Sequence, residues 1–147
     1  MKHAFKNTVE LENFLRSRDL RVTPARVAVI SYLTKQTKPI PIENLQKGIG
    51  KLGIGIDQST IYRSVGTLTK EGIVREIRIS KEKVFIEMAE SDHHHIVCNL
   101  CGLIEETNGC ITDGIEEKTL KHSKKFKKIQ SHSLEFFGVC TVCSKKS

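Results

Sequence analysis

The segment that decides the fold covers residues 57–72 and reads DQSTIYRSVGTLTKEG. Apolar side chains recur in it every three or four residues and predict a helix over 57–71 that stops at Gly72: Ile61, Val65 and Leu68. At about 100° per residue, Ser59 and Arg63 fall on the side of the helix nearly opposite this apolar stripe, and Tyr62 lies at the edge of that polar side. That face has hydrogen-bonding groups, a ring and a guanidinium for phosphates or base edges. The alternative is an ordinary solvated helix face.

Three helices are expected before this segment and a hairpin after it. Periodicity predicts a helix over residues 8–18 and a second that begins at Thr23-Pro24, where Thr can cap and Pro suits the first helical position. A third carries an apolar stripe and gives way to a turn in the glycine-rich stretch 48–55; its stripe is Ile42, Leu45, Ile49 and Leu52. Apolar-rich strand candidates follow at 73–79 and 84–88. This is the order of a winged helix-turn-helix, a DNA-binding arrangement.

Charge and metal-binding side chains separate along the 147 residues. Residues 1–88 hold 16 Lys and Arg against 9 Asp and Glu, whereas residues 89–147 hold 8 of each, so the first part carries the whole net charge of +7. Apart from His3, every Cys and His lies beyond residue 88. We therefore expect a basic module that meets a polyanion over 1–88, followed by a metal-binding module over 89–147. The alternative is that this uneven distribution of charged and metal-binding residues arises by chance in a short chain.

The composition excludes other classes. A chain of this length is too short for a large multidomain enzyme, and with no Trp its cores must be small and aliphatic. No apolar run reaches the roughly 20 residues that span a bilayer, and the first residues lack the apolar region of a signal peptide. We expect a soluble, cytoplasmic protein without a membrane partner.

Two CxxC pairs indicate a closed zinc site. Cys98 and Cys101 form the first pair, Cys140 and Cys143 form the second, and 38 residues separate the two pairs. Two such turns complete a tetrahedral, structural four-cysteine zinc site, whereas a thiol redox role would need only one pair. The separation exceeds that of a compact zinc ribbon, so folded elements should lie between them: a helix over 112–123 and a strand over 128–139. The remaining Cys110 is expected to be a small buried apolar residue.

A run of three histidines precedes the first pair. On a strand, His93 and His95 point to one face, while Asp92 and His94 point to the other, so one strand can serve two sites. Imidazole and carboxylate together suit divalent Zn, Fe, Mn or Co and discriminate poorly among them. Solvated surface histidines are the alternative. The lysine-rich stretch KHSKKFKK at 121–128 is expected to lie at the C-terminal end of a helix and in the following loop, where cations interact favourably with the helix dipole.

Four stretches together resemble the ferric uptake regulator family, in order and over nearly the whole chain: RVTPAR at 21–26, STIYR at 59–63, DHHHIVCNLCG at 92–102 and HSLEFFGVC at 132–140. The resemblance implies an α+β chain, with an N-terminal winged helix-turn-helix and a small α/β dimerisation domain that holds the four-cysteine zinc. It also implies a homodimeric, metal-responsive repressor of metal-uptake or oxidative-stress genes, bound to a two-fold symmetric, AT-rich double-stranded DNA operator.

The resemblance also implies site residues. The regulatory metal, Fe²⁺, Mn²⁺ or Zn²⁺, would be held by Glu87, His93, His95 and Glu106. A further metal site of some relatives would use Asp92, His94, His132 and a carboxylate of Asp113 or Glu116. The residues expected to meet DNA are Arg21, Arg26, Ser59, Thr60, Tyr62, Arg63 and Lys81.

The sequence departs from the family pattern at one regulatory ligand. Family members usually add a His from the loop after the second helix, where this chain has Lys38 or Pro39. The two glutamates, Glu87 and Glu106, favour an iron-type sensor, because peroxide-responsive relatives carry Asp at those positions. A peroxide- or zinc-responsive member remains the alternative within the family. From another class, a zinc-dependent or thiol enzyme is the rival, although no HExxH, nucleophile motif or P-loop is present.

Overall fold

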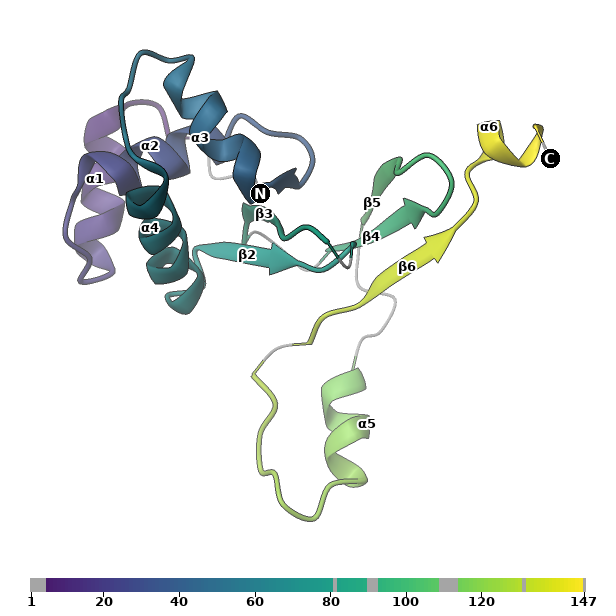
Figure 1. Ribbon diagram of the computed structural model, residues 1–147. Helices are drawn as coiled ribbons and strands as arrows, with labels where there is room; N and C mark the ends of the chain where they lie inside the picture. Colours follow the sequence, from purple (N-terminus) through teal and green to yellow (C-terminus); the bar gives the residue numbers. More distant parts are fainter. Residues whose placement is uncertain (1–4, 81, 90–92, 109–113, 131, 147) are drawn as a thin grey trace. The chain divides into compact units, whose positions relative to one another are not determined.

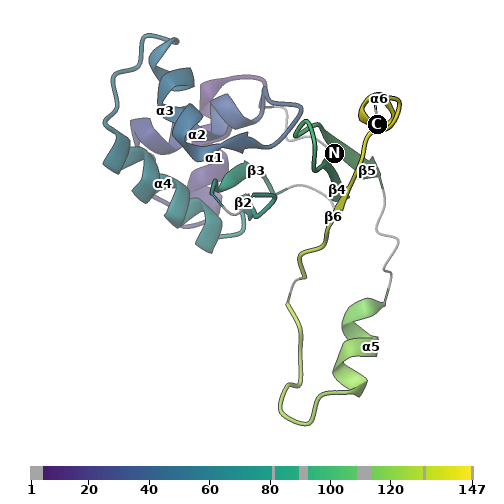
Figure 2. The ribbon, with the colours of Figure 1, turned by 45° about the vertical axis from the view of Figure 1, so that its right-hand side comes forward.

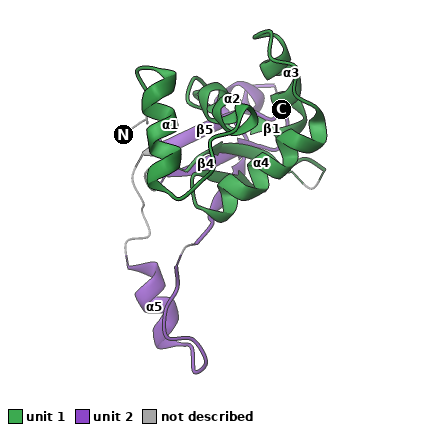
Figure 3. Cartoon of the chain, turned by 90° about the vertical axis from the view of Figure 1, so that its left-hand side faces the viewer, with its two compact units in different colours: residues 1–91 green, residues 92–147 purple. Residues whose placement is uncertain are grey.

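The computed structural model describes residues 5–80, 82–89, 93–108, 114–130 and 132–146. The chain divides into two compact units, residues 1–91 and 92–147, coloured separately in Figure 3. Each unit is described by itself.

The first unit contains four helices: α1 (Thr8–Ser17), α2 (Pro24–Leu33), α3 (Ile42–Gly50) and α4 (Gln58–Lys70). Three begin at a side chain that accepts a hydrogen bond from an otherwise unpaired backbone N–H. Asn7 accepts from Glu10, Thr23 from Arg26, and Asp57 from Thr60. The predicted helices, including the cap at Thr23 and the stop at Gly72, where φ is +66°, are confirmed.

The third helix is shorter than its apolar repeat predicts. α3 ends at Gly50, a turn occupies residues 51–53, and Gly53 takes a φ of +77° that favours glycine. Leu52 consequently leaves the apolar stripe, and its side chain is 51% exposed. Its placement in the buried stripe was therefore a wrong prediction.

A three-stranded sheet completes the first unit. β2 (Val74–Ile77) and β3 (Phe85–Met88) pair antiparallel, with Val74 opposite Met88, and form the predicted hairpin. On the other side of β3 lies β1 (Ile40–Pro41), which the sequence did not predict. The helices pack together beside this sheet in Figure 1 around one aliphatic core, which includes Leu11, Leu15, Ile30, Leu45, Ile49, Ile61, Val65, Leu68, Val74 and Ile86.

The second unit is built around β4 (His93–Cys98). This strand lies between β5 (Ile104–Asn108), which is antiparallel to it, and β6 (Glu135–Gly138), which is parallel. Figure 2 shows the same three strands from a second side. A parallel pair cannot be joined by a tight turn, and the connection between β5 and β6 contains α5 (Ile115–Lys121). A short helix, α6 (Thr141–Ser144), follows β6.

Two predicted elements of the second unit change in extent. The helix expected over 112–123 spans only Ile115–Lys121 within the described residues. The strand expected over 128–139 is reduced to Glu135–Gly138, and residues 128–130 and 132–134 have no strand structure. Neither β5 nor α6 was predicted.

Among the residues that the structure describes, no helix combines the length and the hydropathy needed to cross a bilayer.

Candidate metal centres and nucleic-acid interface

The four paired cysteines converge in the second unit. Cys98 ends β4, Cys101 lies in the following turn, Cys140 precedes α6 and Cys143 lies on α6. Their sulfurs all lie within 4.8 Å of one another, and none of the four is in a disulfide. Parallel pairing of β4 with β6 brings the two CxxC turns to the same end of the sheet, because both strands run toward that end.

The arrangement of the sulfurs fits a zinc ion. In a tetrahedron with metal–sulfur distances of about 2.3 Å, neighbouring sulfurs are about 3.8 Å apart. The Sγ atoms of Cys101 and Cys140 are 3.7 Å apart. Four thiolates leave no coordination position open, so the set suits a structural ion.

Backbone hydrogen bonds already favour one thiolate in this set. The N–H of Cys140 donates to Sγ of Cys98 at 3.3 Å and lowers the pKa of that thiol to about 6. Hydrogen bonding with the Cys140 side chain instead raises the pKa of Cys143 to about 12. Because zinc binds thiolates, loading this set releases protons and is weakened by acid.

The three histidines of β4 alternate between the faces of the sheet, as predicted. The rings of His93 and His95 lie edge to face with centroids 4.9 Å apart. The ring of His94 instead lies 5.5 Å from that of His132, on the opposite face. His94 and His95 are both buried. One strand therefore presents imidazoles to two separate places.

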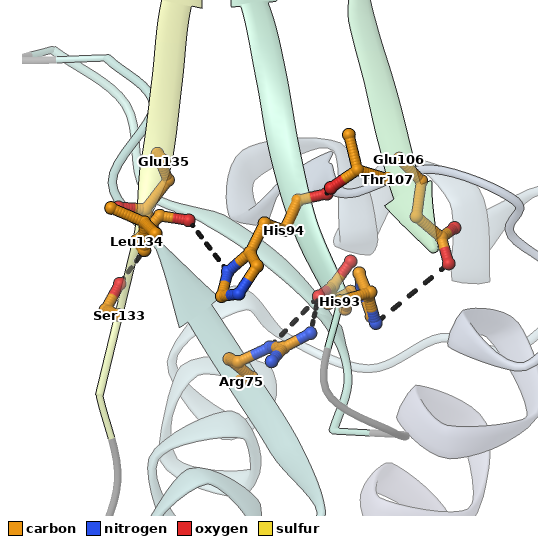
Figure 4. Close-up of polar contacts among 9 residues, drawn as sticks. Arg75, His93, His94, Glu106, Thr107, Ser133, Leu134 and Glu135 are labelled. Atoms are coloured by element: carbon orange, nitrogen blue, oxygen red, sulfur yellow. Dashed lines mark hydrogen bonds and ion pairs between the residues drawn. The ribbon is translucent and has the colours of Figure 1, made fainter. Parts of the chain in front are cut away.

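A carboxylate from β5 joins His93 and His95. Glu106 is the register partner of His95, and its Oε1 lies 4.0 Å from Nδ1 of His93 (Figure 4). Two imidazoles and one carboxylate form a donor set that suits a divalent transition metal. Within the second unit, Glu106 thus lies near His93, and the rings of His93 and His95 are in contact.

The fourth predicted regulatory ligand, Glu87, belongs to the first unit. It lies on β3 opposite Arg75 of β2, and Oε1 of Glu87 accepts a hydrogen bond from Nε of Arg75 at 3.0 Å. A second bond comes from Nη2 of the same guanidinium. The sequence did not single out Arg75 as a partner of Glu87, although the strand register makes them neighbours.

Parts of the possible further site also lie close together. Nδ1 of His132 is 2.6 Å from Oε1 of Glu116, and this contact helps to lower the pKa of Glu116, after the larger effect of the residue's own backbone N–H. Nδ1 of His94 lies 3.2 Å from the carbonyl oxygen of Leu134, which can only accept, so this nitrogen carries the proton. Within the described residues, His94, Glu116 and His132 do not bring three ligand atoms within 4.8 Å of one another.

The outer face of α4 carries the residues expected to meet DNA. Ser59 and Arg63 are exposed and Tyr62 is 39% exposed, whereas Ile61, Val65 and Leu68 are buried. Nη2 of Arg63 donates to Oγ of Ser59 at 3.3 Å. Thr60, which follows Ser59 in the sequence, is half-buried.

Two other predicted contacts lie before and at the start of α2. Arg21 is exposed, and Arg26 donates from Nη1 to the carbonyl oxygen of Arg21 at 2.6 Å. Lys81, Asp92 and Asp113, like Cys110, lie outside the described residues. From the apolar repeat, Asp57 was predicted only to begin a helix. The Asp-x-Ser-Thr pattern at 57–60 is the signal that marks it as a partner for two hydroxyls.

Known proteins resemble this chain over most of its length. The profile of the Ferric uptake regulator family matches residues 17–137. The Peroxide operon regulator of Bacillus subtilis (strain 168) is 28% identical over 144 residues, covering 98% of this chain and 96% of that protein. The Ferric uptake regulation protein of the same organism is 29% identical over 137 residues, covering 90% and 91%.

A solved structure shares the fold as well. The Vibrio cholerae ferric uptake regulator, whose structure is described as revealing a rearrangement of its DNA-binding domains, is 26% identical with a TM-score of 0.68, covering 88% of this chain and 99% of that one. The profile match spans most of the sequence and includes both the α4 face and the first CxxC pair. The chain therefore belongs to the ferric uptake regulator family.

Proposed function

We propose that this protein is a metal-dependent, DNA-binding transcription repressor that controls metal-uptake or oxidative-stress genes. The observation that carries the proposal is the pair of ligand sets to which β4 contributes. At its end Cys98 joins three other cysteines in a closed set, and at its start His93 and His95 lie beside Glu106 of β5. One suits a structural ion and the other suits an exchangeable one. We assign residues 1–88 to a winged-helix DNA-binding domain and 89–147 to a metal-binding dimerisation domain.

The four cysteines would hold the structural zinc. The bound ion supplies positive charge and directional bonds that four clustered thiolates need in order to stay close together. Cys98 and Cys101 tie the end of β4 to the segment of Cys140 and Cys143.

The regulatory ion would be held by His93, His95 and Glu106, with Glu87 supplied by the first unit. These residues hold the ion better when the basic unit is restrained in one arrangement, so occupancy favours that arrangement. Linkage requires that DNA binding strengthens metal binding by the same factor. We retain His94, Glu116 and His132, with Asp92 or Asp113, as ligands of a further site.

We propose an iron-type sensor. Glu87 and Glu106 support it, because peroxide-responsive relatives carry Asp at those positions. The family's usual loop histidine is missing at Lys38 or Pro39, which counts against a peroxide sensor. A peroxide-responsive member is the second candidate, since a Bacillus subtilis peroxide regulator is similar over nearly the whole chain. A zinc-responsive member is the third.

A homodimer would place two α4 helices on a two-fold symmetric, AT-rich operator. The second unit exposes apolar side chains that a partner copy could cover: Ile96, Leu103, Phe137, Val139 and Val142. Ser59, Thr60, Tyr62 and Arg63 would then enter the major groove, with Arg21, Arg26 and Lys81 near the phosphates. We place this regulator in the cytoplasm, where DNA is accessible, and assign it no enzymatic turnover.

A DNA-binding titration on protein that holds only the structural zinc tests the proposal. A duplex selected from a random library with metal-loaded protein serves as the probe, and Fe²⁺, Mn²⁺ or Zn²⁺ is added in turn, before and after peroxide. We expect at least tenfold tighter binding with the sensed metal. His93→Ala and Glu106→Gln should abolish that gain while the four-cysteine zinc remains. Operator binding that is equally tight in chelator would contradict metal control, and no binding under any metal would favour the enzyme alternative.

A further inference from the structure

The first turn of α4 contains a hydrogen-bond network centred on Asp57. Its Oδ1 accepts from Oγ of Ser59 at 2.5 Å and from the backbone N–H of Thr60 at 2.9 Å. Its Oδ2 accepts from Oγ1 of Thr60 at 2.6 Å. Asp57 and Ser59 are both exposed, so this network faces outward.

The network fixes which way the two hydroxyls point. A serine or threonine hydroxyl has one proton and two lone pairs, and a carboxylate has lone pairs alone. Ser59 and Thr60 each give their proton to Asp57, and Ser59 then accepts from Nη2 of Arg63. What these two side chains and Asp57 offer to an incoming ligand is therefore lone pairs.

The carboxylate of Asp57 stays charged while it accepts these hydrogen bonds. Hydrogen bonds from the Ser59 hydroxyl, and then from the Thr60 hydroxyl and N–H, hold the pKa of Asp57 well below its usual range. A charged acceptor cannot pair with a phosphate, which carries no proton at neutral pH and has the same sign of charge. This turn is thus unsuited to the DNA backbone.

The neighbouring surface has the opposite polarity. A cavity of about 330 Å³ lies between the start of α2 and the face of α4, and Arg26, Arg63 and Thr60 line it. The guanidinium of Arg26 is a donor that suits a phosphate. Thr60 lies at the border between the cavity that contains the Arg26 guanidinium and the acceptor-only cluster of Asp57, Ser59 and Thr60. The two surfaces together favour one register of a duplex: backbone at the cavity and base edges at the turn.

We propose that Asp57 is a specificity-determining residue: together with Ser59 and Thr60 it forms an acceptor-only cluster in the first turn of α4, and this cluster selects a base with an exocyclic amino group. In the major groove those bases are adenine, through N6, and cytosine, through N4, whereas guanine and thymine present acceptors there. The strand that faces this turn should carry adenine or cytosine at the contacted position. The inference rests on the proposed function, because it assumes that α4 reads DNA.

Base analogues provide the test. Metal-loaded wild-type protein is titrated with its selected duplex, then with duplexes in which one adenine at a time is replaced by purine, or one cytosine by 2-pyrimidinone, so that the amino group is lost. We expect one position per half-site at which wild-type affinity falls roughly tenfold, as for a hydrogen bond to a charged group. Methylphosphonate substitution should weaken binding at phosphates near Arg26 and leave that base position's preference unchanged.

Asp57→Asn is the decisive variant. Asn also caps helices, so folding is preserved, but its amide donates to Thr60 and lets that hydroxyl point its proton outward. The variant should lose the penalty for amino-group removal and tolerate guanine or thymine at that position. Asp57→Ser is the control, because serine also caps helices and carries neither a charge nor an amide. If the loss of the carboxylate is the cause, this variant should lose the same base preference.

The outcomes separate the two proposals. If both variants keep the wild-type penalty and base preference at every position, the role of Asp57 is overturned while DNA reading stands. If metal-loaded wild-type protein selects no duplex at all, the proposed function itself fails.

Discussion

At the scale of single residues, Gly48 shows how closely α3 packs on α2. A Cβ added at this buried position would lie 2.2 Å from Cζ of the Tyr32 ring, whereas a Cβ at Gly50, two residues on in the same helix, would meet nothing within 4 Å. Alanine favours a helix over glycine by about 1 kcal/mol, but overpacking costs about 1 to 3 kcal/mol. We expect Gly48→Ala to lower the free energy of unfolding by up to about 2 kcal/mol, the difference between these two effects, in urea denaturation.

The matched variant Gly50→Ala should leave that free energy unchanged or raise it by up to about 1 kcal/mol, because only the propensity difference acts there. Equal effects of the two substitutions would show that the Tyr32 ring moves aside without cost.

Asp57 should make stability depend on pH in the acid range. Its pKa in the folded chain lies below the ordinary value of 3.8, because Ser59 and Thr60 donate to it. The unfolded chain therefore takes up this proton first as pH falls, so the stabilisation is complete above pH 3.8 and is lost progressively below it. In denaturation series from about pH 5 to pH 3, Asp57→Asn should show a shallower loss of stability than wild type. Parallel curves for the two proteins would contradict this.

Elements of secondary structure could be predicted where one segment contains its own signal. The four helices of the first unit have apolar repeats, three of them also have capping side chains, and the histidine strand has a two-residue alternation. β1 has two residues, one of them Pro41, and β5 (Ile104–Asn108) has no alternation of apolar and polar residues. Both exist because a partner strand supplies their hydrogen bonds, which no local pattern records.

The end of β4 and the segment after β6 should depend on the four cysteines for their structure. α6 has four residues and no buried side chain, so packing contributes little there. We expect Cys101→Ser to lose the structural zinc and to lower the melting temperature, because three thiolates remain to hold the ion. Zinc content measured by mass spectrometry and thermal unfolding followed by circular dichroism check this.

Cys110→Ser is the matched control, since Cys110 belongs to neither CxxC pair. It should keep one zinc ion per chain, whatever its melting temperature. Zinc loss in this variant would place Cys110 among the ligands and overturn the four-cysteine assignment.

At the scale of the whole molecule, the sequence predicts the candidate sites unevenly. The CxxC pairs and the alternation of His93 and His95 follow from spacing, and the structure brings each set together. The contact of Arg75 with Glu87 and the acceptor network at Asp57 depend on strand register and on hydroxyl orientation. Those are settled by folding, so residue spacing alone does not show them.

The pairing of Arg75 with Glu87 should set how much metal the protein needs. Oε1 of Glu87 accepts a hydrogen bond from Nε of Arg75 at 3.0 Å. If Glu87 is a regulatory ligand, as the resemblance implies, its carboxylate must either give up this bond to bind the metal or bind the metal and Arg75 together. Arg75→Gln removes that competing charge, so we expect the metal concentration at half-maximal DNA binding to fall roughly three- to tenfold, which corresponds to about 1 kcal/mol for one ion pair. Arg78→Gln is the control, because it removes the same charge from an exposed neighbouring position. An equal change in both variants would assign the effect to net charge, and a higher metal requirement in Arg75→Gln alone would mean that Arg75 orients Glu87 instead of competing for it.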